Sequence, residues 1–388
     1  MPPDASSFRI ADLPGASPAP HPEVADLVRY AGADVTLPAR KVVLISVFRD
    51  QLIGGVAVHS SNLYARLREL EAPVEKVDFS GLITAPGIFR KLLVIAGVGM
   101  QLLGHRLNGA KIFHFHGSNR AIMFFVWGPL LWLLGGKLLL SIHSGYGYDR
   151  FMGKRWEYRT LSRLVFPILH RLIFMNPEER DRIAARFPFL RGRVISVNPF
   201  ISPKVAYVDG IRRQRPAPDE IFRVAVIGNW AARYNVEEAF RAALAFRRET
   251  GVPVRVTILQ SSLNRDTDYQ RRLEAEFDLT RDELNVEVFE DRHDVLEILA
   301  LHDVLIRPSL LDSYGLSVAE SLLVGTPAIA TDVCRRCDRA LLYRQGEIAE
   351  VVEHLKTVYA NRGLTNEKLL SDAEDSFFAY AAEYAKIN

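Results

Sequence analysis

The sequence predicts an α/β protein with two parallel sheets of Rossmann type and crossover helices. Short runs rich in leucine, isoleucine and valine alternate with longer amphipathic stretches, which is the pattern of parallel strands joined by helices. This series stops at a proline-rich, charged linker around 203–220 and then restarts. With 388 residues, 48% of them hydrophobic, the chain is long enough to build two separate cores.

The strands are predicted in order along the chain on both sides of the linker. Before it they are 41–48, 74–79, 111–116, 137–143, 171–175 and 193–197. After it they are 222–228, 254–260, 285–290, 303–309 and 326–332. We therefore expect a partly disordered lead-in over 1–39, an N-terminal domain over 40–205 and a C-terminal domain over 218–371.

The end of the chain, 372–388, is predicted to form a helix that returns to the first domain. It places five apolar side chains on one helical stripe, namely Phe377, Tyr380, Ala381, Tyr384 and Ile387. Such a stripe has to pack against another element.

Composition favours a cytoplasmic protein. Cys334 and Cys337 are the only cysteines, so no disulfide framework is expected and a reducing compartment is favoured. Residues 1–39 lack the basic and apolar segments of a secretory signal. The run 121–136 is the candidate for membrane insertion, but it is shorter than the roughly 18–20 residues of a span and Gly128-Pro129 interrupts it. A helix, a turn and a buried strand are expected there.

The stretch 81–176 is both basic and apolar. Its acidic residues are Asp149 and Glu157, and its cations are Arg90, Lys91, Arg106, Lys111, Arg120, Lys137, Arg150, Lys154, Arg155, Arg159, Arg163 and Arg171. One interpretation is a solvated rim around a core. The other is a surface for anionic lipid at the inner face of the plasma membrane, which would make the protein peripheral there. Nucleic acid is disfavoured because no nucleic-acid-binding motif is present.

Ligands of open parallel sheets bind beyond the carboxyl ends of the strands. After the first strand, Gly54 and Gly55 precede a helical pattern, where they permit close approach of a ligand or form a plain turn. Two later strands end in histidines, His114 and His116 in one and His143 in the other. The spacing of these histidines does not match a metal site.

A further candidate stretch follows the predicted strand 303–309. Asp312 and Glu320 flank a helix start at Gly315, where the N–H groups of Tyr314, Gly315 and Leu316 can hold a phosphate or sugar oxygen. Carboxylates in this arrangement can accept hydrogen bonds from the hydroxyl groups of an elongated ligand. The alternative is that Asp312 caps the helix and Glu320 is a surface charge.

The segment "DSYGLSVAESLLVGTPAIATD" resembles the acidic motif, two acids separated by seven residues, of retaining nucleotide-sugar glycosyltransferases with the GT-B fold, family four. "GGVAVHSSNLYARL", "HFHG" and "SIHSG" stand in the expected order. The resemblance implies two Rossmann-like domains, a nucleotide-sugar donor and retention at the anomeric carbon.

The resemblance also implies roles for individual residues. Glu320 would bind the ribose, Asp312 the hydroxyls of the transferred sugar, and His143 would lie near the reacting centre. The remaining donor-binding residues would be Tyr314, Gly315, Leu316, Gly54, Gly55, Gly228 and Asn229, and the acceptor side would include His114 and His116.

The sequence departs from the family pattern in two places. Asp312 stands where the family usually has Glu. After the strand 222–228, Asn229 and Tyr234 occupy the places of an Arg and a Lys that neutralise the diphosphate. We expect Arg233 to supply this charge instead. Arg335 or Arg336 is a weaker candidate for approaching the donor.

No cofactor and no metal are expected. The Asp266 to Asp268 segment imitates a metal-binding acid pair, but it precedes a helical pattern and is predicted to cap a helix. The Cys334 to Cys337 segment imitates a zinc or redox motif, but no further cysteines are available.

The predicted function is transfer of a sugar to a lipid-linked or oligosaccharide acceptor in the assembly of bacterial cell-surface polysaccharide, such as exopolysaccharide or lipopolysaccharide. Two alternatives remain open. One is a nucleotide-sugar epimerase or hydrolysing relative, and the other is a catalytically silent subunit that binds a nucleotide-sugar.

Overall fold

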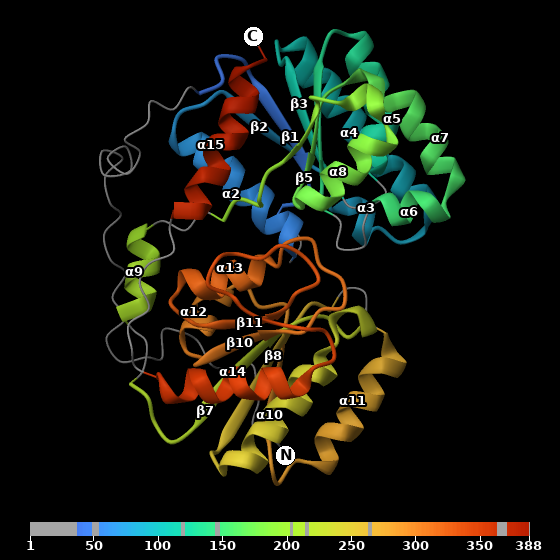
Figure 1. Ribbon diagram of the computed structural model, residues 1–388. Coiled ribbons are helices and arrows are strands. Elements are labelled where there is room, and N and C mark those ends of the chain that lie inside the picture. The colour runs from blue at the N-terminus through green and yellow to red at the C-terminus, as the bar shows by residue number, and fades with distance from the viewer. Residues whose placement is uncertain are drawn as a thin grey trace. The chain divides into compact units, whose positions relative to one another are not determined.

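The computed structural model describes residues 37–387 except 49–53, 118–120, 144–147, 202–204, 214–216, 263–265 and 363–370. The lead-in predicted over 1–39 lies almost entirely outside the described residues. The described chain contains two six-stranded parallel sheets with helices (Figure 1). This is the predicted fold class.

The first sheet has the strand order β2-β1-β3-β4-β5-β6 and the second β12-β11-β10-β7-β8-β9. The strands of the first are β1 Val42–Ser46, β2 Val74–Asp78, β3 Ile112–Gly117, β4 Lys137–Ile142, β5 Leu169–Phe174 and β6 Val194–Ser196. Those of the second are β7 Phe222–Ile227, β8 Val254–Gln260, β9 Asn285–Glu290, β10 Val304–Arg307, β11 Ala328–Thr331 and β12 Leu341–Tyr343.

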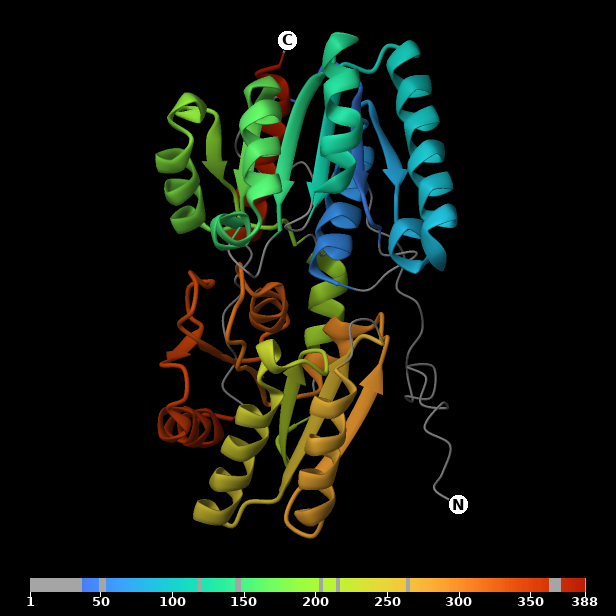
Figure 2. The same ribbon diagram turned by 90° about the vertical axis from the view of Figure 1, so that its right-hand side faces the viewer.

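Helices cover both faces of the first sheet. They are α2 Gly55–Glu69, α3 Gly81–Thr84, α4 Gly87–Leu107, α5 Ile122–Leu133, α6 Tyr148–Lys154, α7 Trp156–Val165, α8 Pro177–Arg186 and α15 Ser371–Ala385. Figures 1 and 2 show α2 and α15 on one face, and α4, α5 and α7 on the other.

The second sheet has its own set of helices. They are α9 Val205–Arg213, α10 Val236–Thr250, α11 Thr267–Leu279, α12 Val295–Ala300, α13 Leu316–Leu323 and α14 Ile348–Ala360. Helix α9 lies inside the segment predicted as a linker, and its Ile211 packs into the apolar cluster around Leu305 and Val318. This part of the linker is therefore folded.

Strand β3 decides what each face of the first sheet contains. Successive side chains of a strand point to opposite faces. Phe113 and Phe115 pack into the apolar core with Phe124 of α5. His114 points the other way, where its Nδ1 lies 2.6 Å from the hydroxyl oxygen of Tyr384 on α15. Histidines in this strand are thus buried against α2 and α15.

Helix α15 returns to the first domain, as predicted. The five side chains of its apolar stripe are all buried. Arg171 of β5 donates to Glu383 at 2.5 Å, and Phe377 packs against Phe200, with ring centroids 5.3 Å apart. Helix α15 therefore completes the core of the first domain.

All the predicted strands are confirmed, with ends that differ by a few residues. The strand missed by the sequence analysis is β12, which pairs with β11 from Ile329↔Leu341 to Thr331↔Tyr343. It has three residues, too few to show the alternation that identifies a strand.

Each sheet has a point where the strand order reverses, and loops at such points bind ligands. In the second sheet β7 lies between β10 and β8, so the residues after β7 and β10 meet there. In the first sheet the corresponding point lies between β1 and β3. Residues predicted to bind donor or acceptor follow these strands.

The run 121–136 forms the expected helix and turn before β4, but it is not the segment best suited to a membrane. Among the described residues, the helix that is long and apolar enough to cross one is α4, with 21 residues. Only 17% of the most apolar 18-residue stretch of this helix is buried. Sequence reasoning overlooked it because Arg90, Lys91 and several glycines interrupt the run.

Two glycines of α4 provide a test of its packing on α5. A Cβ at Gly99 would meet the Trp127 ring at 2.1 Å, whereas a Cβ at Gly97 would have nothing within 4 Å. We predict that Gly97→Ala raises the free energy of unfolding by up to about 1 kcal/mol through helix propensity. Gly99→Ala should lower it by about 1–3 kcal/mol through overpacking. Urea unfolding of both variants measures this, and equal effects would contradict the packing.

Candidate functional site

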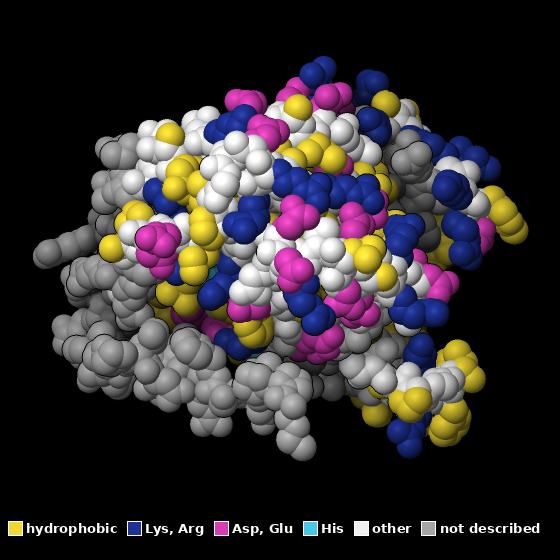
Figure 3. Space-filling model, turned by 90° about the horizontal axis from the view of Figure 1, so that it is seen from below, with side chains coloured by type: hydrophobic (Ala, Val, Ile, Leu, Met, Phe, Trp, Pro, Cys, Tyr) yellow, Lys and Arg dark blue, Asp and Glu magenta, His cyan; other side chains and the backbone are white. Residues whose placement is uncertain are grey.

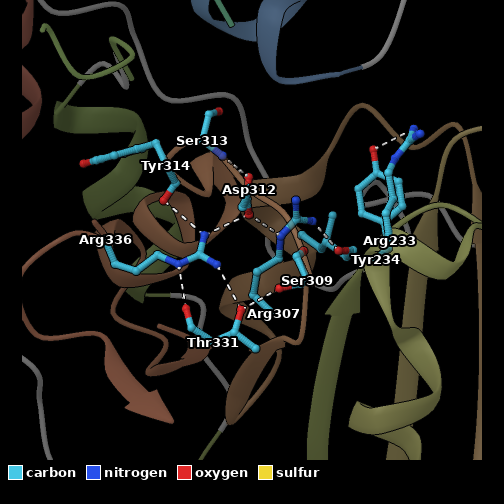
Figure 4. Close-up of polar contacts among 10 residues, drawn as sticks. Arg233, Tyr234, Arg307, Ser309, Asp312, Ser313, Tyr314, Thr331 and Arg336 are labelled. Atoms are coloured by element: carbon cyan, nitrogen blue, oxygen red, sulfur yellow. Dashed lines mark hydrogen bonds and ion pairs between the residues drawn. The ribbon is translucent and has the colours of Figure 1, made fainter. Parts of the chain in front are cut away.

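Three charged side chains meet beyond the carboxyl ends of β10 and β11. Arg307 is the last residue of β10, Asp312 follows five residues later, and Arg336 comes from the loop after β11. The Oδ2 atom of Asp312 accepts from Arg307 Nε at 3.0 Å and from Arg336 Nη1 at 2.8 Å. Figure 4 shows both guanidinium groups pointing toward this carboxylate. We call these residues the arginine–aspartate cluster.

The arginine–aspartate cluster is buried and carries a net positive charge. The side chains of Arg307, Asp312 and Arg336 are 12%, 11% and 1% exposed. Burial by itself raises the pKa of Asp312, but the two guanidinium groups outweigh burial and lower this pKa to about 2. At neutral pH the cluster therefore holds two positive charges and one negative charge. An excess cation with little solvent around it favours a nearby anion.

Arg336 also links the cluster to the neighbouring chain segments. Its Nε donates to the carbonyl oxygen of Thr331 at 3.1 Å, and its Nη1 donates to that of Tyr314 at 3.2 Å. The next residue, Gly315, has φ +81°, and a Cβ there would meet Arg336 Nη1 at 2.2 Å. Both the backbone angle and the arginine require glycine at this position.

Gly315 is the N-cap of α13, so the predicted helix start is confirmed. Leu316 is its first residue, and the Tyr314 hydroxyl oxygen lies 2.8 Å from Cys337 Sγ. Glu320 is half-buried on α13. The amide groups at a helix start and the positive end of its dipole favour an anion. Helix α13 thus begins beside the cationic cluster.

Arg233, the residue predicted to supply the missing positive charge, lies against Tyr234. The Arg233 guanidinium carbon lies 4.8 Å from the centroid of the Tyr234 ring, and that of Arg307 lies 5.4 Å from the same centroid. Figure 4 shows the Arg233 guanidinium pointing away from Asp312. Arg233 is therefore close to the cluster but not part of it, and its role stays a prediction.

Arg307 was missed by the sequence analysis. Its Nη1 donates to the carbonyl oxygen of Ile227, the last residue of β7, at 2.5 Å. The guanidinium group therefore contacts the end of β7, immediately before the loop that holds Gly228 and Asn229. Among the described residues, its Nη2 has no hydrogen-bond partner. An arginine at the end of an otherwise apolar strand was the available signal.

Gly228 and Asn229 form the loop after β7, as expected. A Cβ at Gly228 would lie 3.0 Å from Tyr234 Cβ, so the loop is tight. The Oδ1 atom of Asn229 accepts from the backbone N–H of Ser261 at 3.1 Å. Asn229 therefore joins the ends of β7 and β8, and its contact with a donor stays a prediction.

The first domain brings its predicted histidines together. His116 Nδ1 and His143 Nε2 lie 3.2 Å apart. His114 uses both ring nitrogens within the domain, toward Tyr384 and toward Ser141 Oγ at 2.8 Å. A fourth histidine that sequence reasoning did not single out, His59 of α2, lies against them, with its ring centroid 4.9 Å from that of His143.

Burial keeps these four histidines neutral. Desolvation lowers the pKa of His114 and His143 to about 3, and it lowers the pKa of His59 and His116 well below the ordinary value. A neutral imidazole donates one hydrogen bond and accepts another, but it brings no positive charge. His143 is therefore suited to orienting a hydroxyl group rather than to stabilising an anion by charge.

Gly54 and Gly55 lie at the start of α2, as predicted. Gly54 is the N-cap with φ +151°, and Gly55 is the first helical residue. One group among the described residues could hold a metal by distance alone, namely His59, His116 and His143. The expectation of a metal-independent protein stays a prediction.

Residues 208–363 match the family model described as glycosyl transferases group 1. The catalytic domain of starch synthase IV from Arabidopsis thaliana, bound to ADP and acarbose, is 12% identical with a TM-score of 0.65, over 90% of this chain and 99% of that one. Among curated proteins, none matches the sequence.

Two bacterial structures are similar to a comparable degree. Sucrose-phosphate synthase from Thermosynechococcus elongatus is 16% identical with a TM-score of 0.63, over 90% of this chain and 97% of that one. The Anabaena protein HepE, in complex with UDP and glucose, is 14% identical with a TM-score of 0.59, over 90% and 94%.

The fold is therefore the two-domain α/β fold seen in these glycosyltransferase structures, known as GT-B. Within the chain, the segment 208–363 is similar to the group 1 glycosyl transferases. That segment contains the arginine–aspartate cluster, α13 and Glu320. Assignment to family four stays a prediction.

The neutral histidines generate a prediction for acid stability. Their folded pKa values lie below 6.5, so unfolding takes up protons once the pH falls below about 6.5. Stability should be complete above this pH and should fall toward pH 4, with each histidine contributing up to about 1.4 kcal/mol per pH unit. Urea unfolding from pH 7 to 4 measures the slope. His114→Gln should reduce it by about one proton, and an unchanged slope would contradict the assignment.

Proposed function

We propose that the protein is a metal-independent, retaining glycosyltransferase that moves a sugar from a nucleotide diphosphate donor to a saccharide acceptor. The observation that supports this best is the group 1 match over 208–363, because the matched segment holds a buried cationic cluster beside a helix start. A departing diphosphate develops negative charge, and preorganised cations and N–H groups stabilise it.

Arg307 is proposed as the main diphosphate cation in place of the usual Arg and Lys. Its guanidinium touches the end of β7, where the family has these cations, and its Nη2 has no hydrogen bond to a described residue. Arg336, in contrast, donates to Asp312, Thr331 and Tyr314 and is almost fully buried. Arg336 therefore positions the loop, while Arg307 is available to an anion.

Asp312 has two proposed tasks. Its Oδ2 atom holds both arginines in place, and its Oδ1 accepts the N–H of Ser313 at 3.0 Å. A carboxylate oxygen has two lone pairs, so Oδ1 can still accept a hydrogen bond from a sugar hydroxyl. Glu320 is proposed to bind the ribose and His143 a hydroxyl of the sugar. No protein nucleophile is needed, because the acceptor hydroxyl attacks the face that the diphosphate leaves.

The acceptor is proposed to be a lipid-linked saccharide in cell-surface polysaccharide assembly, reached at the inner face of the plasma membrane. Helices α4, α5 and α7 support this with large apolar side chains exposed to solvent. We call these exposed side chains the apolar face. Its most exposed members are Ile88, Phe89, Leu92, Leu93, Met100, Leu107, Leu133, Trp156 and Leu164. Helix α4 packs on α5, and α5 on α7. Large exposed apolar patches mark binding surfaces.

Basic side chains accompany the apolar face. Arg90 and Lys91 lie on α4 beside Phe89, and Arg155 precedes Trp156 at the start of α7. Figure 3 shows hydrophobic and basic side chains side by side at the right-hand edge of the view. Each Lys or Arg near an anionic bilayer contributes about 1 kcal/mol of attraction. Apolar and basic side chains together favour an anionic lipid surface as the occupant.

Helix α4 is proposed to lie along the membrane rather than to cross it. It buries Val98, Gly99 and Leu102 against the rest of the domain, and the Trp127 side chain of α5 donates to the Ile95 carbonyl oxygen at 3.1 Å. A helix held in the helical layer on one side presents only its other side to lipid. This is the geometry of an interfacial helix.

The proposed cation predicts the ranking of three variants. Arg307→Gln should lower kcat/KM by about 100-fold, the usual cost of losing one charge-stabilising donor. Arg307→Lys should retain part of the activity, and Arg233→Gln should have the smaller effect. Glu320→Gln should weaken donor binding by roughly tenfold through the loss of a charged acceptor. Initial rates with the donor chosen by thermal shift among uridine, guanosine and adenosine diphosphate sugars measure these effects.

Several outcomes would contradict this assignment. A larger loss in Arg233→Gln than in Arg307→Gln would return the cation role to Arg233. Turnover of the donor without any acceptor would favour an epimerase or a hydrolase. Tight nucleotide binding with no transfer to any acceptor would favour a silent binding subunit.

The apolar face predicts binding to anionic membranes. A variant on this face and a control variant elsewhere on the surface test the prediction. Phe89→Ser combined with Leu93→Ser should reduce binding to phosphatidylglycerol vesicles at least about tenfold, because about 25 cal/mol is lost for each Å² of apolar surface withdrawn from water. Leu279→Ser, at a position 87% exposed on α11, should leave binding unchanged. Vesicle co-sedimentation at low salt measures this. No binding by the unaltered protein, or dimers held together by this face, would contradict the proposal.

A further inference from the structure

Three of the four buried histidines converge on one point in the first domain. His59 comes from α2, His116 from β3 and His143 from the end of β4. One ring nitrogen from each lies within 4.8 Å of the other two. These elements are far apart in the sequence, so the tertiary structure is what brings the three histidines together.

Two buried ring nitrogens in this group, His59 Nε2 and His116 Nε2, make no hydrogen bond to any of the residues that the structure describes. An unsatisfied buried polar atom costs about 1–3 kcal/mol, and buried polar groups in folded proteins are almost always paired. Two such atoms in one cluster indicate a shared partner.

The proton on His59 has a defined position. Its Nδ1 lies 2.8 Å from the backbone N–H of Phe200 and accepts a hydrogen bond from it. Burial keeps the ring neutral, and a neutral imidazole has one N–H. The N–H of His59 is therefore on Nε2, and this atom is a donor with no acceptor in the described part of the chain.

Protonation argues against a metal ion at this point. The distances alone suit either a metal ion or an oxygen atom, because one ring nitrogen from each histidine lies within 4.8 Å of the other two. A metal ion takes a lone pair from each ligand nitrogen, and the protonated Nε2 of His59 has none.

We infer that His59 and His116 bind one uncharged hydroxyl oxygen, supplied by water or by a sugar, and that His116 connects this oxygen to His143. His59 Nε2–H donates to this oxygen, and the hydroxyl hydrogen is donated to His116 Nε2. His116 then has its N–H on Nδ1 and donates to His143 Nε2, 3.2 Å away. The N–H of His143 is left on Nδ1. One chain of hydrogen bonds thus runs from the backbone of Phe200 to His143.

This chain makes His59 and Phe200 positioning residues for His143. Without them, the pair His116 and His143 has two equivalent arrangements of its N–H groups. With them, one arrangement is selected, and His143 is a donor at Nδ1. The hydroxyl site does not depend on the proposed function, but the sugar as its source rests on that function.

A crystal structure of the unaltered protein, grown with zinc chloride and measured at the zinc absorption edge, tests the ligand. The expected result is density at about 2.8 Å from His59 Nε2 and His116 Nε2 without anomalous signal. Anomalous signal, with contraction to about 2.1 Å, would overturn the inference, and so would the absence of any density. A second crystal soaked in glucose separates the two sources, since a ring in the density identifies a sugar and a single peak identifies water.

Ring nitrogen NMR tests the hydrogen-bond chain in solution, without donor or activity. The expected result is N–H on Nε2 for His59 and on Nδ1 for His116 and His143. His302 is an internal reference of the opposite kind to His59, because its Nδ1 donates to the Ile298 carbonyl oxygen at 2.6 Å. N–H on Nδ1 in His59 would overturn the inference.

Two substitutions separate the hydroxyl site from general packing. His59→Gln keeps an amide N–H near the former Nε2 and should retain the density, whereas His59→Leu should lose it. His59→Leu should also give His143 signals from both N–H arrangements, with the His302 signals unchanged as evidence of folding. A single unchanged His143 arrangement in His59→Leu would overturn the positioning role.

Discussion

The candidate site of the second domain depends on the sharing of one buried carboxylate by two arginines. A lone carboxylate at that depth would be protonated or costly, and two unpaired arginines would be costlier still. Together, Arg307, Asp312 and Arg336 are stable when buried because each charge has an opposite neighbour. The same contacts hold the Tyr314 carbonyl oxygen and require a glycine at 315, so α13 begins where it does. Electrostatics and backbone conformation are inseparable here.

The first domain differs from the second because its buried polar cluster, formed by histidines, carries no charge. Strand β3 sends phenylalanines into one helical layer and histidines toward the other. Neutral imidazoles tolerate burial because each can be both donor and acceptor, provided that partners exist. His114 is paired with Ser141 and Tyr384, whereas His59 and His116 each have one ring nitrogen that is unpaired within the described ranges. The two domains thus offer contrasting environments, one for an anion and one for hydroxyl groups.

Much of this was available in the sequence, and the exceptions have physical reasons. Buried parallel strands are continuous apolar runs, so their positions were predictable, whereas β12 is too short to show any period. The acids and glycine around 312–320 mark the site by type and spacing. Arg307 was not predicted because its relevance comes from pairing between β10 and β7, which are distant in the chain. Likewise, α4 is interrupted by glycines that look like breaks until Gly99 is seen against Trp127.

The packing of α15 on the first sheet affects the order in which the two domains can fold during synthesis. Residues 371–387 are the last described segment to leave the ribosome, yet they cover the face that contains His114 and Met175. Domains generally fold as they emerge, from the N-terminus onward. Here the first domain is completed by a helix that is synthesised after all the strands of the second sheet. The face of the first sheet that carries His114 is therefore covered only after the second domain has been synthesised.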